Sequence, residues 1–331
     1  MSETIAVSYS KVKAWRFCRQ NYWYKYHDRI VPKRKPKPLK IGSLVHEVLE
    51  AMAKKQDWRL LISAAQKEYN KMFAEEKEFY GNYPEDVERI IKGYIRHYKD
   101  EPFLFSCPET TFGPIPLSEE TSFKFKVDKL AQPQQGVNKG DLFLWETKTG
   151  RRIPQDDMRI WDLQTVVYIW GLKQCGKPVK GIIWDYLRTK APTVPAVLKN
   201  GTLSRAQNID TDYFTYLEAI RNNGEDPKDY ADFLESLKNR DVEFYKRVMV
   251  PISNAVIDSV VSDFKQTSRE IYYLEDSPVK SISGYTCPRC DYSSICYAGI
   301  RGSDEAFIRK TEFVVKPDEE DQPIVDESDV D

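Results

Sequence analysis

Three residues near the middle of the chain have the types and spacing for metal-assisted phosphate chemistry. Glu146 and Lys148 lie two residues apart at the end of the apolar run 141–150, and Asp128 ends the alternating segment 121–128. Alternate residues of a strand face the same side, so Glu146 and Lys148 are expected to project together. A carboxylate beside an ammonium is costly to bury without partners, and a divalent cation and a phosphate would supply them.

The two segments are expected to form an antiparallel hairpin. Residues 132–136 between them are rich in turn-forming types, which favours a tight connection. Such a hairpin would bring Asp128 beside Glu146 and Lys148. The alternative is a surface hairpin with an ordinary salt bridge, because an Asp followed at a distance by Glu-x-Lys also occurs by chance.

Three polar residues lie on segments whose apolar periodicity predicts helices. His46 is at the edge of the apolar stripe of 41–54, and Gln164 and Tyr168 are four residues apart in 157–174. Residues four apart share a helix face. By itself this spacing says little about function, and a histidine on such a stripe is more often a core residue than a ligand.

Three of the six cysteines have the spacing of a metal-binding loop. Cys287, Cys290 and Cys296 form a C-x2-C-x5-C pattern. Thiolates held close together need a cation, and three ligands require a fourth. Zinc accepts four cysteines in tetrahedral geometry, and free thiols are a further alternative. Cys107 and Cys175 are expected to be ordinary thiols.

Together these motifs resemble the RecB-like iron–sulfur branch of the PD-(D/E)XK nuclease superfamily, which includes AddB and the CRISPR spacer-acquisition nucleases. The superfamily signature would be Asp128, Glu146 and Lys148. Residues 42–46 match the G-x-x-x-H segment of that branch, and Gln-x-x-x-Tyr follows the Glu-x-Lys strand. The resemblance runs from about Ser8 to Cys296, with residues 190–250 as its main departure.

The resemblance implies a fold and a role for each of these residues. The expected fold is α/β, with a restriction-endonuclease-like core whose mixed central β-sheet is flanked by helices, a helical subdomain, and an iron–sulfur-clamped N- and C-terminal region. The metal, Mg²⁺ or Mn²⁺, would be bound by His46, Asp128, Glu146 and the Thr147 carbonyl. The catalytic set would be Asp128, Glu146, Lys148, Gln164 and Tyr168.

The resemblance also implies a [4Fe–4S] cluster. In those families one early cysteine and a late C-x2-C-x5-C hold the cluster, and the matching positions here are Cys18, Cys287, Cys290 and Cys296. Such a cluster would clamp the N-terminal segment to the C-terminal segment, so its expected role is structural. The spacing does not separate it from zinc.

The expected function is a DNA nuclease, an exonuclease on single-stranded or end-exposed DNA, in recombination, repair or phage- or CRISPR-type DNA processing. The chain has no G-x4-G-K-[ST] motif, so a separate helicase or recombination protein is a candidate partner. The alternatives are a non-catalytic DNA-binding or assembly module of the same fold and a zinc-stapled nucleic-acid adaptor.

Charge and composition suit a nucleic-acid partner. The net charge is −1, but residues 317–331 carry eight acidic and no basic residues, which leaves 50 Lys and Arg against 43 Asp and Glu before them. This tail could compete for the DNA surface or serve as a solubilising segment. The basic, aromatic stretch 8–26 could stack bases or belong to the core. Without a signal peptide or a membrane-length apolar run, a cytoplasmic, membrane-free location is expected.

The expected organisation follows these motifs along the chain. The predicted divisions are 1–40, a cluster-ligand segment with a basic loop; 41–116, a helical region with His46; 117–190, the nuclease core; 191–250, an inserted helical segment; 251–310, a helix with the cysteine cluster; and 311–331, a disordered acidic tail.

Overall fold

The computed structural model describes residues 4–34, 36–99, 102–154, 162–240, 243–274 and 279–317. The chain divides into two compact units. The first comprises Met1–Lys35, Gly113–Lys124 and Val261–Asp331, and the second comprises Pro36–Phe112 and Phe125–Val260.

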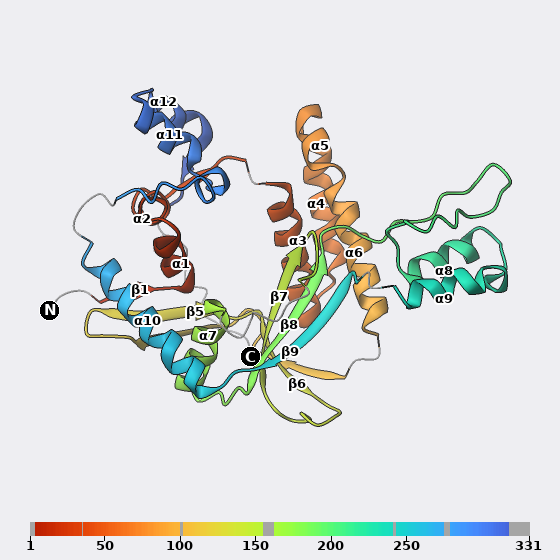
Figure 1. The fold of residues 1–331 in the computed structure, drawn as a ribbon, viewed down its shortest axis with the longest axis horizontal. Helices are drawn as coiled ribbons and strands as arrows, with labels where there is room; N and C mark the ends of the chain where they lie inside the picture. The colour runs from red at the N-terminus through yellow and green to blue at the C-terminus, as the bar shows by residue number, and fades with distance from the viewer. Residues whose placement is uncertain are drawn as a thin grey trace. The chain divides into compact units, whose positions relative to one another are not determined.

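The second unit is built on a five-stranded sheet with the strand order β3-β6-β7-β8-β9 (Figure 1). Its strands are β3 Phe103–Ser106, β6 Lys129–Pro133, β7 Phe143–Gly150, β8 Gly181–Arg188 and β9 Tyr245–Pro251. The β7–β8 pair is parallel, and the other three pairs are antiparallel. The expectation of a mixed sheet in an α/β protein is confirmed.

Helices cover both faces of this sheet. They are α3 Lys37–Ala53, α4 Arg59–Lys71, α5 Ala74–Tyr80, α6 Tyr83–His97 and α7 Leu163–Gln174. Neighbouring residues of a strand point to opposite faces. Gln164 of α7 contacts Glu146, whereas Tyr94 of α6 contacts Asp185, the register partner of Thr147. The helices α6 and α7 therefore lie on opposite faces.

Apolar spacing explains the elements that hold the site. In α3 the buried residues include Ile41, Val45, Val48 and Leu49, which fall on one helical face. This helix starts earlier than predicted, with Pro38 in its first turn, where proline is well tolerated. Strand β8 is buried along nearly its whole length, as a strand covered by helices on both faces must be.

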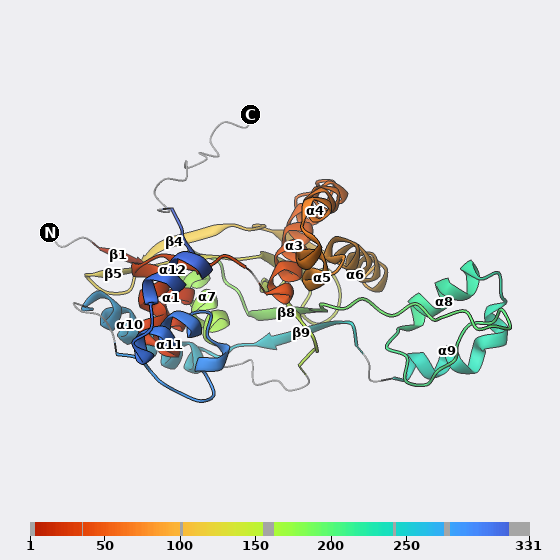
Figure 2. The ribbon, with the colours of Figure 1, turned by 90° about the horizontal axis from the view of Figure 1, so that it is seen from above.

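The segment before β9 forms a small helical body with its own core (Figure 2). It contains α8 Tyr213–Asn222, the short 3₁₀ helix η3 Pro227–Tyr230 and α9 Ala231–Lys238. Tyr216 and Tyr230 are at its centre. The predicted helical insertion 191–250 was wrong at its end, because Tyr245–Pro251 form strand β9. Lys246 and Arg247 interrupt the apolar pattern of this strand and concealed it.

The first unit contains a two-stranded sheet, β10-β2, and a three-stranded sheet with the order β1-β5-β4. Its elements are β1 Ile5–Val7, α1 Tyr9–Phe17, α2 Arg19–Tyr22, the π-helical η1 Trp23–His27, β2 Ile30–Pro32, the 3₁₀ helix η4 Cys287–Arg289, α11 Ser293–Arg301, α12 Glu305–Glu312 and β10 Phe313–Val315. Three elements run across the boundary between the units: β4 Thr111–Pro116, β5 Thr121–Lys126 and α10 Asn254–Tyr272.

The predicted hairpin between 121–128 and 141–150 was wrong in its first strand. Strand β5 pairs in the three-stranded sheet. The chain bends at Asp128, and the strand that pairs with β7 is β6, with Lys129 opposite Trp145. Pro133 and the glutamines around it resemble a turn in sequence, which hid the strand. Asp128 still comes close to β7 because it directly precedes β6.

Two other expectations also need correction. The predicted helical region 41–116 does not continue to its end, because residues 102–116 contain β3 and β4. The predicted tail 311–331 begins with ordered structure, because Phe313–Val315 pair with β2 and the Phe313 ring stacks on Tyr292, 5.7 Å away between ring centroids. The acidic residues after Pro317 lie outside the described residues.

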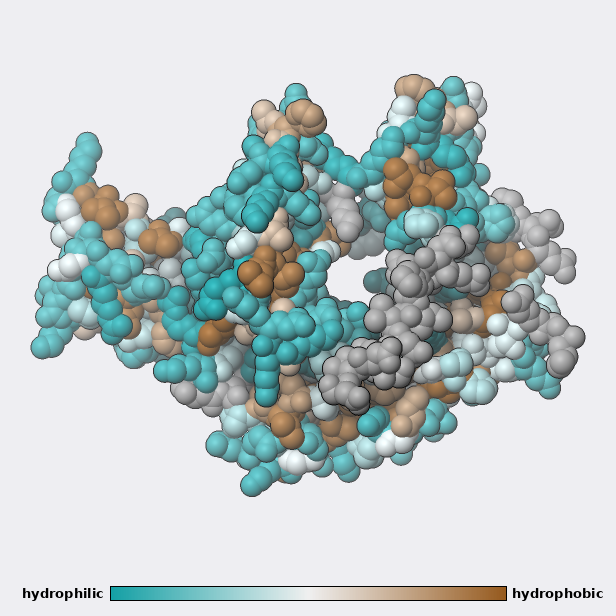
Figure 3. Space-filling view, turned by 180° about the vertical axis from the view of Figure 1, so that it is seen from behind, coloured by the Kyte–Doolittle hydropathy of each residue, from teal (hydrophilic) through white to brown (hydrophobic). Residues whose placement is uncertain are grey.

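The surface visible in Figure 3 is largely hydrophilic, and its hydrophobic residues form small separate groups. Scattered groups of this kind are normal for a folded domain in water. No helix among the described residues combines the length and apolar character needed to cross a membrane.

A buried ionic network fixes β8 and β9 beneath α6. Asp185 is fully buried and accepts hydrogen bonds from Arg247 Nε at 3.0 Å and Tyr94 Oη at 2.7 Å. Tyr94 Oη in turn accepts from Arg247 at 2.6 Å. Burial raises the pKa of Asp185 to about 6, and the charge of Lys129 and, next, hydrogen bonding to Tyr94 oppose this. A charge in this position is stable only with its partners.

The variant Arg247→Met should therefore be about 3–5 kcal/mol less stable than the wild type, because it leaves the buried Asp185 without its cation. Urea unfolding monitored by circular dichroism measures this. The double variant Asp185→Asn/Arg247→Met should recover part of the loss, since the carboxylate that Arg247 paired with is also removed. A single variant as stable as the wild type would contradict this role.

Candidate functional site

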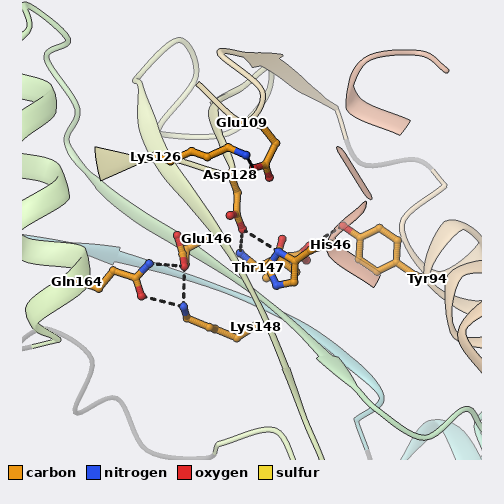
Figure 4. Close-up of polar contacts among 10 residues, drawn as sticks. His46, Tyr94, Glu109, Lys126, Asp128, Glu146, Thr147, Lys148 and Gln164 are labelled. Carbon is orange, nitrogen blue, oxygen red and sulfur yellow. Dashed lines mark hydrogen bonds and ion pairs between the residues drawn. The ribbon is translucent and has the colours of Figure 1, made fainter. Parts of the chain in front are cut away.

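Five of the residues singled out from the sequence lie near one another around β7 (Figure 4). Glu146 and Lys148 belong to β7, and Asp128 is at the bend before β6. His46 comes from α3 and Gln164 from α7. The site is therefore assembled from two strands and two helices of one unit.

Glu146, Lys148 and Gln164 form a closed set of hydrogen bonds. Lys148 Nζ donates to Glu146 Oε1 at 2.6 Å and to Gln164 Oε1 at 2.9 Å, and Gln164 Nε2 donates to Glu146 Oε1 at 2.7 Å. The Glu146 side chain is 6% exposed, whereas that of Lys148 is 38% exposed. The carboxylate is thus held inside while the ammonium remains accessible to a bound substrate.

Burial changes the protonation of Glu146. Desolvation and, next, the negative charge of Asp128 raise the pKa of Glu146 to about 7, while Lys148 and Gln164 oppose the rise. A nearby divalent cation would favour the ionised carboxylate. The pKa rise therefore reflects mainly the burial of this carboxylate and, next, the nearby charge of Asp128.

Asp128 is held by the main chain of β7. Its Oδ2 accepts a hydrogen bond from the Thr147 N–H at 2.8 Å, and His46 Nδ1 lies 3.7 Å from the same oxygen. The contact that Thr147 makes here is through its N–H, so its carbonyl as a metal ligand stays a prediction. His46 and Asp128 are brought together as expected from the sequence.

The donor atoms suit a hard cation, although they do not surround one point. The hydrogen bonds to Glu146 use Oε1 and the contacts of Asp128 use Oδ2, so within the described residues Oε2 and Oδ1 carry no hydrogen bond. Carboxylate oxygens are preferred ligands of Mg²⁺ and Mn²⁺. In the described part of the chain, however, no three His, Cys, Asp or Glu side chains are close enough to hold one ion. The three-ligand set remains a prediction.

Tyr168 is one helical turn beyond Gln164 on α7, and its described contact is with an aromatic ring. It is 8% exposed, and its ring centroid lies 4.9 Å from that of Phe125. The observed packing therefore places the Tyr168 ring against Phe125. Its predicted contact with a DNA strand stays a prediction.

Sequence reasoning missed several charged residues around Asp128. Glu109 pairs with Lys126 at 2.6 Å, and its N–H donates to the Asp128 carbonyl. Lys129 is 7% exposed and lines a small cavity with His46 and Asp128. A signal was available for Asp185, which is a lone acid within an apolar strand. None of the motifs pointed to Glu109.

In the other unit, the four cysteines of the predicted cluster line one cavity of about 330 Å³. Cys18 lies between α1 and α2, while Cys287 begins η4 and Cys296 lies in α11. The remaining walls include the apolar side chains of Phe17 and Ile300. The structure therefore brings residues from both ends of the sequence around a shared space.

N–H groups point at three of these sulfur atoms. Asn21 Nδ2 donates to Cys290 Sγ at 3.4 Å, and the N–H groups of Ser281 and Ser283 donate to Cys18 Sγ at 3.4 Å and Cys287 Sγ at 3.3 Å. Burial raises the pKa of the Cys296 thiol, and the other three cysteines raise this pKa as well. Such donors stabilise thiolates that bind a metal centre.

Because Glu146 must be ionised to bind a cation, Mn²⁺ binding should weaken by about tenfold for each pH unit below about 7. Calorimetric titration of the protein with Mn²⁺ at several pH values measures this. The variant Glu146→Gln should lose this pH dependence. An affinity that stays constant down to about pH 5 would mean that Glu146 has an ordinary pKa or does not bind the ion.

Comparison with known protein families agrees with this geometry. The family model described as "PD-(D/E)XK nuclease superfamily" matches residues 6–297, which is most of the chain. A search of curated proteins gave no match. Members of this superfamily typically use Mg²⁺ or Mn²⁺, and membership implies nuclease activity on DNA. The chain belongs to the PD-(D/E)XK nuclease superfamily.

Proposed function

We propose that this protein is a Mg²⁺- or Mn²⁺-dependent deoxyribonuclease of the RecB-like iron–sulfur branch. Its expected substrate is single-stranded or end-exposed DNA, which it would degrade as an exonuclease in recombination, repair or phage- or CRISPR-type DNA processing. The observation that carries the proposal is the buried Glu146 bound to the accessible Lys148 beside Asp128. The exonuclease activity, the cytoplasmic location and a helicase or recombination partner rest on the sequence alone.

Each residue of the site has a defined task in this proposal. Asp128 and Glu146 offer Oδ1 and Oε2 to the ion, and His46 adds an imidazole nitrogen. When bound, the ion supplies Lewis-acid activation of water and of the scissile phosphate. Lys148 stabilises the negative charge that develops on the phosphate oxygens. Gln164 fixes the positions of Lys148 and Glu146 through its two hydrogen bonds.

The cysteine cavity supports a structural [4Fe–4S] cluster as part of the proposal. Four thiols are among the residues that line a cavity of about 330 Å³, and three of the sulfurs accept N–H hydrogen bonds. Cys18, Cys287, Cys290 and Cys296 would be its ligands, and the cluster would hold the N-terminal and C-terminal segments together.

Replacing Lys148 by alanine should reduce DNA cleavage by about 100-fold or more while DNA binding and the cluster persist, because charge stabilisation at the phosphate is lost. Cleavage of end-labelled DNA and a binding assay with Ca²⁺ measure the two effects. The control Lys199→Ala changes an exposed lysine and should cleave as the wild type does. Wild-type cleavage by Lys148→Ala would remove Lys148 from this role.

Cys290→Ser should yield colourless, unstable protein with little DNA binding, because one cluster ligand is lost. The readouts are iron content and the absorbance shoulder near roughly 400 nm expected of iron–sulfur centres. Cys175→Ser is the matched control, since Cys175 is exposed and outside the cavity. A brown, stable and active Cys290→Ser protein would contradict the structural cluster.

A further inference from the structure

Gly42 of α3 marks a place where this helix lies very close to strand β7. The residue is buried, and a Cβ atom added to it would lie 2.8 Å from Thr149 Oγ1 of β7. Atoms that are not hydrogen-bonded pack best at about 3.5–4.0 Å. A residue with a side chain would therefore fit here only if α3 or Thr149 moved. Gly42 thus lets α3 approach β7 more closely than a residue with a side chain would.

This close approach lies one helical turn from His46. Residues four apart on a helix share a face, so Gly42 and His46 both face β7. Residues two apart on a strand also share a side, and Thr147 accordingly lines one small cavity with His46 and Asp128. His46 Nδ1 lies 3.7 Å from Asp128 Oδ2. The spacing set at Gly42 and Thr149 therefore bears directly on where the imidazole lies.

The close approach explains why a glycine occupies this helical position. Gly42 lies inside the 17-residue helix α3, where glycine is less favourable than alanine. Without the contact to Thr149, Gly42→Ala would be harmless or stabilising. With the contact, α3 would have to shift by roughly 0.5 Å or more to accept the methyl group. Because a metal site tolerates ligand displacements of only about 0.5 Å, such a shift would move His46 out of position.

We propose that Gly42 is a positioning residue, which holds α3 against Thr149 at the distance from which His46 reaches the metal ion. This inference rests on the proposed nuclease function, because it concerns a ligand of the same ion. Gly42 itself contacts neither the ion nor the substrate and acts only through His46.

Mn²⁺ titration of the full-length protein by calorimetry tests the inference. Gly42→Ala should bind Mn²⁺ about tenfold more weakly than the wild type, or weaker still, because one ligand is displaced. In Gly42→Ala/Thr149→Ala the closest atom left at position 149 is the Cβ, at 4.0 Å, so the affinity should return to that of the wild type. The control Ser43→Ala changes an exposed residue of the same helix and should bind as the wild type does.

A double-mutant cycle with His46→Ala separates positioning from general damage to the fold. His46→Ala alone should weaken Mn²⁺ binding, and adding Gly42→Ala to it should change the affinity little further, because the displaced ligand is already gone. A merely structural role of Gly42 would give the same loss of affinity whether or not His46 is present.

The possible outcomes separate this inference from the function on which it rests. Wild-type affinity of Gly42→Ala, wild-type affinity of His46→Ala, or an equal loss with and without His46 would overturn the inference alone. If Gly42→Ala does not fold, the double variant Gly42→Ala/Thr149→Ala decides: wild-type affinity supports the inference, and weak binding or failure to fold overturns it. If the wild type binds no Mn²⁺ that Asp128→Ala removes, the proposed nuclease function fails together with the inference.

Discussion

The site depends on one constraint. A carboxylate buried in a sheet needs hydrogen-bond partners that fix its position and stabilise its ionised form. Glu146 meets this condition because Lys148 and Gln164 both donate to its Oε1. Strand geometry provides the first contact, since residues two apart on β7 face the same side. Helix α7 provides the second. Within the described residues the other carboxylate oxygen accepts no hydrogen bond, and the side chain of Lys148 is 38% exposed.

The opposite face of the same strand is fixed by different charges. The Thr147 N–H holds Asp128, and Trp145 lies between the cations of Lys129 and Arg247, at 4.8 Å and 4.6 Å from its ring centroid. Arg247 in turn binds Asp185 on the neighbouring strand. The backbone from Trp145 to Lys148 is therefore held from both sides.

The sequence predicted the residues of the site better than the path of the chain around them. Local spacing was enough to predict that Glu146 and Lys148 share one side of a strand. It was also enough to predict the helices that carry His46 and Gln164. It failed for the strand beside β7, because β6 is short, polar and ends in proline, and for β9, where Arg247 interrupts the apolar pattern. Asp185 stands out as a lone acid in an apolar strand, but its pairing with Arg247, like the position of Glu109 beside Asp128, carries no local signal, since only tertiary packing brings these residues together.

The central claim is that Asp128 and Glu146 bind a divalent cation that enables cleavage of DNA. Incubating the full-length wild type with end-labelled single-stranded DNA, with Mg²⁺ or Mn²⁺ and in parallel with excess chelator, tests it most directly. The account predicts that the labelled strand is degraded with either ion and stays intact with the chelator. DNA that remains intact under all conditions, or cleavage that persists in the chelator, would contradict it.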